Sequence, residues 1–377
     1  MAAPKNLRTP GPTPLPPEVR DALAQDMVNH RGPEFAAILR ECVEGLKWAY
    51  QTTETDHDLV ILTTSGTGGL ESLVANTLSP GQPLLVASIG NFGERIAQIA
   101  RVFGANVTQI DAEPGRALDP QLLEDTLRRD PTLETVFVTH NETSTGVLNP
   151  LRELAAAIRA ARPQALVLVD GISSVSSVPI VPEAWGCDVV VAGSQKGWMT
   201  PPGLAFVSIS PRAWERQSRS TLPKFYFDWQ LARRSAESGE TPWTPAVSLF
   251  YALQAGLRHM RQEGLEHIFA RHEQLARYTR EGLADLDVQL VADPRFASPT
   301  VTAAWLPEGV NGKALLTALD ERHGVVLAGG QGNLSGKIFR IGHMGWVEQS
   351  ELDEVLRALQ VELNSIRATT AAGRSSP

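Results

Sequence analysis

Apolar residues form six short runs between residues 58 and 194, and stretches with helical spacing separate them. The runs occupy residues 58–64, 83–88, 106–111, 135–140, 165–170 and 188–194. Between them, stretches such as "ERIAQIARVFG" and "PLRELAAAIRAA" repeat apolar residues every three or four positions, as helices packed on a core do. Continuous apolar strands that alternate with helices favour a parallel sheet covered on both faces. The pattern therefore predicts an α/β fold.

The pattern changes near residue 246. Two helical stretches, 246–263 and 265–285, precede the strand-like "TVTAAWL", a helix in "GKALLTALDERHG", the strand-like "KIFRIG" and a last helix in "SELDEVLRALQVELNSI". This order predicts a second, smaller α+β domain. We expect four segments, which are a proline-rich arm at 1–17, a large domain at 18–260, a small domain at 261–366 and a disordered tail at 367–377.

Composition narrows the classes of function. The 377 residues carry a formal net charge of -8, which is the wrong sign for a nucleic-acid-binding surface. The two cysteines, Cys42 and Cys187, lie far apart, which excludes a disulfide framework and a cysteine-rich metal site and favours a reducing compartment. The chain begins without a secretory signal, and no apolar run approaches the length of a membrane span. We therefore expect a cytoplasmic protein with no metal, nucleic-acid or membrane partner.

The candidate chemistry begins at Lys196, which follows the last apolar run in "GSQKG". A surface loop is the ordinary place for a lysine, because its ammonium group is costly to desolvate. Here Gly197 and the "PPG" at 201–203 bend the chain around it, and open α/β sheets bind ligands at the carboxyl ends of their strands. A lysine held in that crevice has a lowered pKa and can attack a carbonyl group.

Other polar groups follow the ends of other predicted strands. Ser65, Gly66 and Thr67 stand in the turn "TTSGTGGLES", whose backbone amides could bind an anion, although a tight strand–helix turn explains it equally well. The turn matches neither a Walker loop nor GxGxxG, so it does not indicate a nucleotide. Asp170 ends the run at 165–170, where it could cap a helix or pair with a cationic ring nitrogen.

An aromatic ring and a hydroxyl complete this set. Phe92, in "GNFGER", could stack on a flat ligand, and Thr143, in "THNETSTG", adds a polar group at the same edge of the sheet. A lysine for a Schiff base, an aspartate for a ring nitrogen, a ring for stacking and an anion cradle together indicate pyridoxal 5'-phosphate.

Segments along nearly the whole chain resemble the class V pyridoxal-phosphate aminotransferases, in particular the alanine–glyoxylate and serine–glyoxylate group. The matching segments are "GPTPLPPEV", "HRGPEF", "TTSGTGGLES", "GNFGER", "THNETSTGV", "VDGISSV", "GSQKG", "TPAVSL" and "RIGHMG". The aspartate of "VDGISSV" followed by the lysine of "GSQKG" is the specific part of this pattern. The resemblance implies fold type I, with a mostly parallel seven-stranded sheet, a small C-terminal α+β domain and a homodimer with shared active sites.

The resemblance also implies a role for each candidate residue. Lys196 would form the Schiff base and move the proton during catalysis, and Asp170 would hold the protonated ring nitrogen. Arg340, in "RIGHMG", would bind the substrate carboxylate. The alternative without a role in function is an arginine exposed on an edge strand. Thr244 would contact the phosphate of the neighbouring subunit.

The remaining roles concern the cofactor itself. Phe92 would stack on one face of the ring, where relatives often have tryptophan, and Ile172 would lie on the opposite face. Thr143 would place its hydroxyl near the ring oxygen. The phosphate cradle would consist of Ser65, Gly66, Thr67 and Gln195.

These roles predict a pyridoxal-phosphate-dependent transaminase that moves an amino group from alanine or serine to glyoxylate or pyruvate. Arg340 is the one arginine that the motifs place in the pocket, so the distal carboxylate of an acidic donor such as glutamate would stay unpaired. A small neutral donor leaves no charge without a partner.

Three other functions compete with this one. Cysteine desulfuration is not supported, because residue 195 is glutamine rather than histidine and no cysteine follows Cys187. A nicotinamide dehydrogenase lacks the GxGxxG fingerprint. The alternative that we retain is an accessory subunit of a soluble, hydrogenase-like redox complex. Two isolated cysteines cannot hold an iron–sulfur cluster, however, and a complete lysine–aspartate–phosphate set would be idle in a scaffold.

Overall fold

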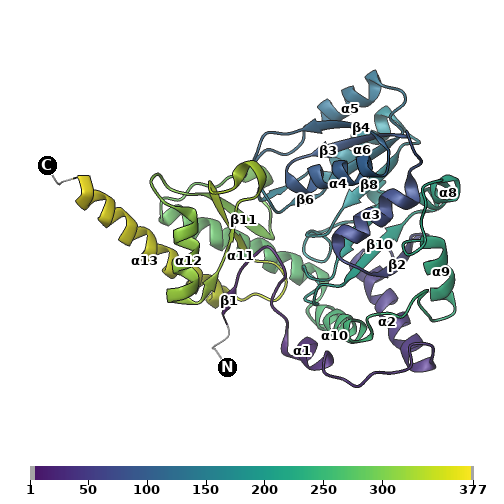
Figure 1. Ribbon diagram of the computed structural model, residues 1–377, viewed down its shortest axis with the longest axis horizontal. Helices are drawn as coiled ribbons and strands as arrows, with labels where there is room; N and C mark the ends of the chain where they lie inside the picture. The colour runs from purple at the N-terminus through teal and green to yellow at the C-terminus, as the bar shows by residue number, and fades with distance from the viewer. Residues whose placement is uncertain (1–4, 375–377) are drawn as a thin grey trace.

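The computed structural model describes residues 5–374 as two packed parts, and residues 1–4 and 375–377 lie outside the described chain. Figure 1 shows the larger part on the right and the smaller, carboxyl-terminal part on the left. Within the described residues, no helix combines the length and the apolar character that a membrane span requires.

A seven-stranded sheet forms the centre of the larger part. Its strands are β2 (Asp58–Thr63), β3 (Pro83–Ser88), β4 (Asn106–Asp111), β5 (Thr135–Thr139), β8 (Leu166–Asp170), β9 (Val189–Gly193) and β10 (Leu204–Ile209). Their order across the sheet is β2-β10-β9-β8-β5-β3-β4. Strand β10 is antiparallel to both of its neighbours, and all other neighbouring pairs are parallel. The mostly parallel seven-stranded sheet is therefore confirmed. The apolar runs indicated every strand of this sheet except β10.

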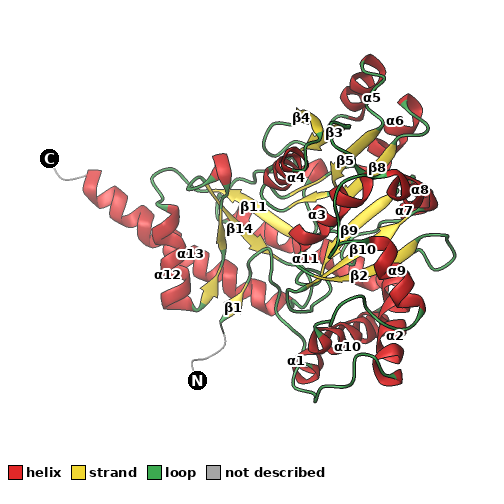
Figure 2. Ribbon diagram, turned by 45° about the vertical axis from the view of Figure 1, so that its right-hand side comes forward, coloured by secondary structure: helices red, strands yellow, loops and turns green. Residues whose placement is uncertain are grey.

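Helices cover both faces of this sheet (Figure 2). One face packs on α3 (Gly66–Thr77), α4 (Asn91–Val102), α8 (Pro211–Arg219) and α9 (Trp229–Glu237). The other face packs on α2 (Pro33–Ala49), α5 (Pro120–Arg129), α6 (Leu151–Ala161) and α10 (Val247–Glu263). Successive side chains of a strand point to opposite faces, so in β8 Leu168 joins one core and Val169 the other. This explains why the strands read as continuous apolar runs.

The smaller part is an α+β domain, as predicted. Its strands β11 (Val301–Trp305), β13 (Ala328–Gly329) and β14 (Ile338–Gly342) form an antiparallel sheet in the order β11-β14-β13. The helices α11 (Leu265–Asp285), α12 (Gly312–His323) and α13 (Gln349–Arg374) pack on it. We propose a domain boundary near residue 260, since α10 packs with the large sheet and most of α11 with the small one. Residues 367–374 of the predicted tail continue α13, and its residues 375–377 lie outside the described chain.

Short elements connect these layers. They are β1 (Asn6–Leu7), α1 (Pro17–Ala22), β6 (Asn141–Glu142), β7 (Val147–Leu148), α7 (Pro182–Trp185), η1 (Pro294–Phe296), β12 (Val325–Val326) and η2 (Gly332–Leu334). Strand β1 pairs with β12, so the amino-terminal arm is anchored on the small domain. The arm then crosses to the large domain, where the Thr13 N–H donates to the Gln195 carbonyl at 3.1 Å.

Candidate active site

The carboxyl ends of the parallel strands bring most of the predicted residues to one edge of the sheet. Ser65 follows β2, Phe92 lies in the first turn of α4 after β3, and Thr143 lies in the turn of the short β6–β7 hairpin after β5. Asp170 ends β8, and Gln195 and Lys196 follow β9. This is the edge at which open α/β sheets bind their ligands. The structure thus brings these residues to one edge of the sheet, and their roles stay predictions.

Lys196 is buried, with 8% of its surface exposed. Its Nζ donates to the carbonyl of Pro10 in the amino-terminal arm, and its own carbonyl accepts the Thr13 hydroxyl at 3.0 Å. Glycine is favoured at position 11, because the backbone there has a φ of +113° and a Cβ would stand 2.8 Å from the lysine Nζ. Burial lowers the pKa of Lys196 to about 8, although the nearby Asp170 carboxylate opposes this change. The side chain can therefore lose its proton near neutral pH and act as a nucleophile or a base.

Asp170 is a buried carboxylate that few donors stabilise. Within the described chain, its carboxylate has one hydrogen-bond donor, the Ile172 N–H, which lies 2.9 Å from Oδ1. Burial raises the pKa of Asp170 to about 7, and the Ile172 N–H and the Lys196 charge oppose the rise only in part. A buried carboxylate that lacks donors is stabilised when a cationic group arrives beside it.

The predicted phosphate cradle lies at the amino end of α3. The Ser65 hydroxyl caps this helix by accepting the Gly68 N–H at 3.2 Å. Gln195 lies close to the same turn, and Gly193 stands between them. A Cβ added to Gly193 would be 3.0 Å from the Gln195 Oε1 and 3.5 Å from the Gly66 Cα. That Oε1 is buried and has no hydrogen-bond partner among the described residues. Free backbone amides and the helix dipole make this end of α3 suited to an anion.

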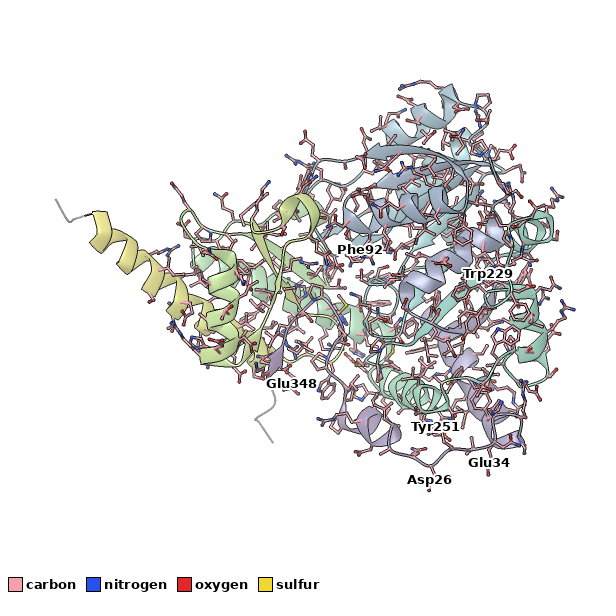
Figure 3. The ribbon with its side chains drawn as sticks, viewed as in Figure 1. Asp26, Glu34, Phe92, Trp229, Tyr251 and Glu348 are labelled. Atoms are coloured by element: carbon pink, nitrogen blue, oxygen red, sulfur yellow. The ribbon has the colours of Figure 1, made fainter. Side chains whose placement is uncertain are left out.

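Phe92 and Ile172 border the same space. Phe92 is half-buried at the start of α4, and Figure 3 shows it at the side of the large domain that faces the small domain. Ile172 lies against the cradle, since a Cβ on Gly66 would stand 2.9 Å from its Cδ1.

Arg340 reaches the site from the small domain. It lies on β14, the central strand of the small sheet, so the interpretation as a surface arginine on an edge strand is wrong. Only 5% of its surface is exposed. Its Nε donates to the Gly329 carbonyl at 2.9 Å and its Nη1 to the Thr143 carbonyl at 3.0 Å. The guanidinium group is thus fixed against the large domain beside Thr143, with burial lowering its pKa.

The structure does not bring Thr244 together with the other predicted residues. Thr244 is exposed on the loop between α9 and α10, and no contact described for the chain joins it to the rest of the site. Its predicted contact is with the phosphate of a neighbouring subunit, and that role stays a prediction.

Sequence reasoning missed two charged residues of this region. Arg95 lies over the Phe92 ring, 4.7 Å from the ring centroid, and its Nη1 donates to the Thr67 hydroxyl at 3.4 Å. Its spacing of one helical turn after Phe92 could have indicated this contact. Glu142 is fully buried beneath the loop that carries Thr143, and its position within "NETST" gave no sign of burial.

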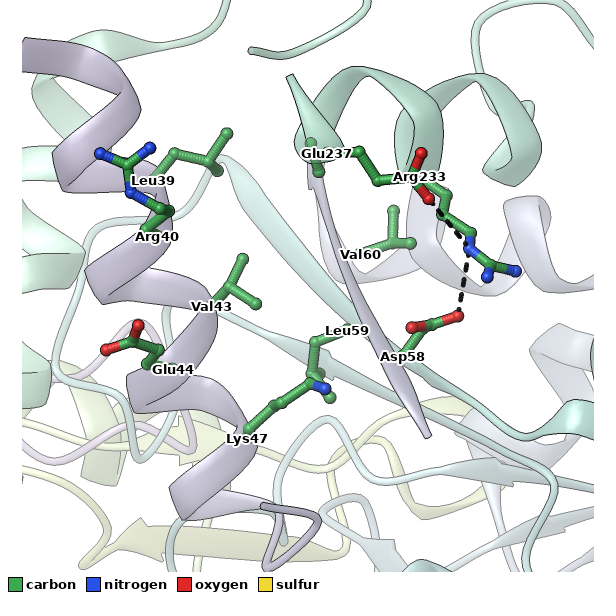
Figure 4. A pocket seen from close by; sticks show the side chains of 11 residues that line it. Leu39, Arg40, Val43, Glu44, Lys47, Asp58, Leu59, Val60, Arg233 and Glu237 are labelled. Carbon is green, nitrogen blue, oxygen red and sulfur yellow. Dashed lines mark ion pairs between the residues drawn. The ribbon is translucent and has the colours of Figure 1, made fainter. Parts of the chain in front are cut away.

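A separate cavity of about 360 Å³ lies between α2, β2 and α9 (Figure 4). Arg233 borders it and pairs with Asp58 at 3.4 Å and with Glu237 at 3.6 Å. The cavity adjoins Asp58, Leu59 and Val60, at the end of β2 opposite to the turn that carries Ser65. None of the predicted site residues lines it.

Comparison with known proteins identifies the family. The family model for class V aminotransferases matches residues 6–347. The chain is a class V aminotransferase. Class V aminotransferases use pyridoxal 5'-phosphate, which is therefore the cofactor of this enzyme and confirms the prediction from the strand-end residues.

Three similar proteins have different names. The enzyme is 42% identical over 359 residues to the soluble hydrogenase 42 kDa subunit of Anabaena cylindrica, covering 95% of this chain and 92% of that one. It is 37% identical to the L-aspartate–glyoxylate aminotransferase of Paracoccus denitrificans, covering 89% and 85%. The crystal structure of an alanine–glyoxylate aminotransferase from Nostoc sp. has a TM-score of 0.91 at 31% identity and covers 96% of each chain.

The residues at the site fit the cofactor. The free amino end of α3 suits the phosphate, and Gln195, whose Oε1 has no hydrogen-bond partner among the described residues, can turn its amide NH₂ toward the phosphate as a donor. The poorly stabilised Asp170 carboxylate suits a protonated ring nitrogen. When bound, the cofactor supplies a carbonyl group for the amine and a ring that accepts electrons. The chain itself places a buried amine, a buried carboxylate, the free amino end of a helix and a fixed guanidinium group around this space.

Proposed function

We propose that this aminotransferase moves the amino group of a small neutral amino acid, alanine or serine, to glyoxylate or pyruvate. Two of the relatives described above carry glyoxylate in their names, which supports this acceptor. The observation that carries the proposal is Arg340, the buried guanidinium group whose planar fork can bind one carboxylate bidentately. Each proposed substrate presents one carboxylate.

Each site residue then has a specific task. The Arg340 guanidinium binds and orients the substrate carboxylate. Lys196 Nζ, which can be neutral because of its lowered pKa, would take the proton from the substrate Cα and deliver it to the C4′ carbon of the bound cofactor. The Asp170 carboxylate keeps the ring nitrogen protonated, while Phe92 and Ile172 confine the ring.

The phosphate contacts complete the proposal. We assign the phosphate to Ser65, Gly66, Thr67 and Gln195, with Thr143 near the ring oxygen. Thr244 would add a contact from the second subunit of a homodimer, and the enzyme would act in the cytoplasm.

One observation favours a second class of donor. Arg95 borders the site: its charge opposes in part the rise that burial causes in the pKa of Asp170, and adds to the lowering that burial causes in the pKa of Lys196. The Arg95 guanidinium group could bind the distal carboxylate of aspartate, the donor in the name of the Paracoccus relative. We prefer the neutral donor, because Arg95 contacts Phe92 and Thr67 on the phosphate side of the site.

The accessory-subunit alternative takes its support from the name of the Anabaena relative. Its weakness is the buried pair of Lys196 and Asp170, which an inert scaffold would not need and which costs desolvation free energy. A purified protein with the visible absorbance of a bound pyridoxal group supports the enzyme. A colourless protein that takes up no cofactor supports the scaffold.

The substrate proposal is tested by comparing kcat/KM for alanine, serine, aspartate and glutamate with glyoxylate as the acceptor. We expect alanine or serine to exceed both acidic donors by at least about tenfold, because a buried unpaired carboxylate costs more than about 1.4 kcal/mol. A preference for aspartate that is lost in Arg95→Gln would establish the second class of donor instead. Replacing glyoxylate with pyruvate and 2-oxoglutarate then ranks the acceptors.

A further inference from the structure

Glu142 is a charged residue at the site to which no role has been given. It ends β6, and none of its surface is exposed. Its Oε2 accepts the backbone N–H groups of Phe92 at 3.0 Å and of Gly93 at 3.4 Å. Its Oε1 accepts the N–H of Ser144 at 3.0 Å and the hydroxyl of Ser144 at 2.6 Å. Four donors thus converge on one carboxyl group.

Three of these donors are backbone N–H groups, which can only donate, and this arrangement favours the ionised form of Glu142. The Ser144 hydroxyl accepts the Asn91 N–H at 3.2 Å, so its own hydrogen is available for Glu142. A carboxylate accepts all four hydrogen bonds, whereas a protonated carboxyl group would have to reverse the one with Ser144. Burial raises the pKa of Glu142, but the bonds from Ser144, Phe92 and Gly93 oppose that rise. The carboxylate also lies at the amino end of α4, where the helix dipole stabilises a negative charge.

The carboxylate fixes the first turn of α4 in one position. Phe92 and Gly93 belong to that turn, and both donate to the same oxygen. The chain packs directly on Glu142 just before the helix, because a Cβ on Gly90 would stand 2.7 Å from its carboxyl carbon. A change at Glu142 therefore moves the backbone that carries the Phe92 ring.

We propose that Glu142 is a positioning residue for the cofactor, which holds the first turn of α4 so that the Phe92 ring lies against the pyridoxal ring. The inference rests on the proposed role of Phe92. It concerns cofactor binding and does not depend on which amino acid is the donor, so a wrong substrate assignment would leave it intact.

The first test measures the dissociation constant of pyridoxal 5'-phosphate for the cofactor-free protein by fluorescence titration. In Glu142→Gln, the amide NH₂ must face donors on one side, which releases either α4 or Ser144. We expect the dissociation constant to rise about fivefold, because a stacked ring contributes roughly twofold to tenfold to binding. Glu362→Gln is the matched control. That buried carboxylate binds His323 at 2.8 Å in the small domain, so its loss should lower stability and leave cofactor affinity unchanged.

The decisive measurement is a double-mutant cycle with Phe92→Leu. If Glu142 acts through the ring, adding Glu142→Gln to Phe92→Leu should raise the dissociation constant by less than about twofold. The same fivefold rise in both backgrounds, or a wild-type constant in Glu142→Gln, would overturn the proposal. If Glu142→Gln does not fold, Ser144→Ala removes one donor and keeps the charge. Ser144→Ala should raise the dissociation constant by a smaller factor, and this rise should disappear in the Phe92→Leu background. A dissociation constant unchanged by Ser144→Ala would count against the proposal.

Discussion

Replacing Asp170 with asparagine should stabilise the cofactor-free protein at pH 8. Burial raises the pKa of this carboxyl group from its ordinary 3.8 to about 7, and that difference corresponds to about 4 kcal/mol of unfavourable free energy when the group is ionised. Asparagine keeps an oxygen for the Ile172 N–H and removes the charge. Its buried amide costs about 1–3 kcal/mol without an acceptor. We therefore expect a net gain of about 2 kcal/mol in the free energy of unfolding.

The gain in stability should depend on pH. A folded-state pKa above the unfolded value means that the wild-type protein is favoured at low pH and loses stability as the pH rises from about 4 to about 7. The gain from Asp170→Asn should therefore be about 2.5 kcal/mol smaller at pH 5 than at pH 8. Urea unfolding at both values, with the cofactor removed, measures the difference. The cofactor-loaded variant should lose most of its activity, because the ring nitrogen has lost its counter-charge.

Asp188 offers a control with the opposite sign. It is equally buried, but its carboxylate accepts Arg159 at 2.7 Å, the Val167 N–H at 2.8 Å and the Ser210 hydroxyl at 3.0 Å. Asp188→Asn should cost about 3 kcal/mol of stability, because it breaks a satisfied buried pair. If Asp170→Asn instead destabilises the protein as Asp188→Asn does, and equally at pH 5 and pH 8, then Asp170 is a structural cap and the reasoning fails.

Further predictions concern the lysine, the arginine and the second subunit. Lys196→Ala should lose nearly all transamination while it still binds the cofactor, which visible absorbance and turnover together measure; wild-type turnover would refute the assignment. Arg340→Ala should raise KM for both the amino acid and the oxo acid, and Arg340→Lys should rescue it only in part, because a point charge does not replace the planar fork. Mixing a Lys196→Ala chain with a Thr244→Ala chain should restore activity through hybrid dimers with one intact site; no recovery despite proven subunit exchange would count against a shared site.

The position of the candidate site could be predicted from the sequence, whereas the burial of its charged residues could not. Strand ends can be found from apolar runs, and parallel strands end at one edge, so Lys196, Asp170 and the cradle could be brought together without coordinates. Burial of a single polar residue leaves no such periodic signal. Glu142 stands in a polar segment with the composition of an ordinary loop, and its burial depends on α4, which is distant in the sequence.

Two other features, strand β10 and the central position of Arg340, were also missed. Strand β10 was missed because its "LAFVSI" directly follows the proline-rich turn after Lys196 and no helix separates it from β9. The pattern of alternating strands and helices therefore did not include it. The position of Arg340 on a central strand depends on pairing with β11 and β13, and such long-range pairing cannot be read from "KIFRIG" alone.

The amino-terminal arm explains how a lysine at the end of a strand becomes reactive. A lysine lowers its pKa only when water is kept from its ammonium group, and the strand end alone leaves that group at an open edge of the sheet. The arm supplies the cover through Pro10, Gly11 and Thr13, which contact Lys196 directly. The arm is itself held on the small domain, where the Gly342 N–H donates to the Arg8 carbonyl at 2.7 Å. The small domain thus contributes to the site twice, because it carries Arg340, the proposed ligand of the substrate carboxylate, and holds the arm that shields Lys196 from water.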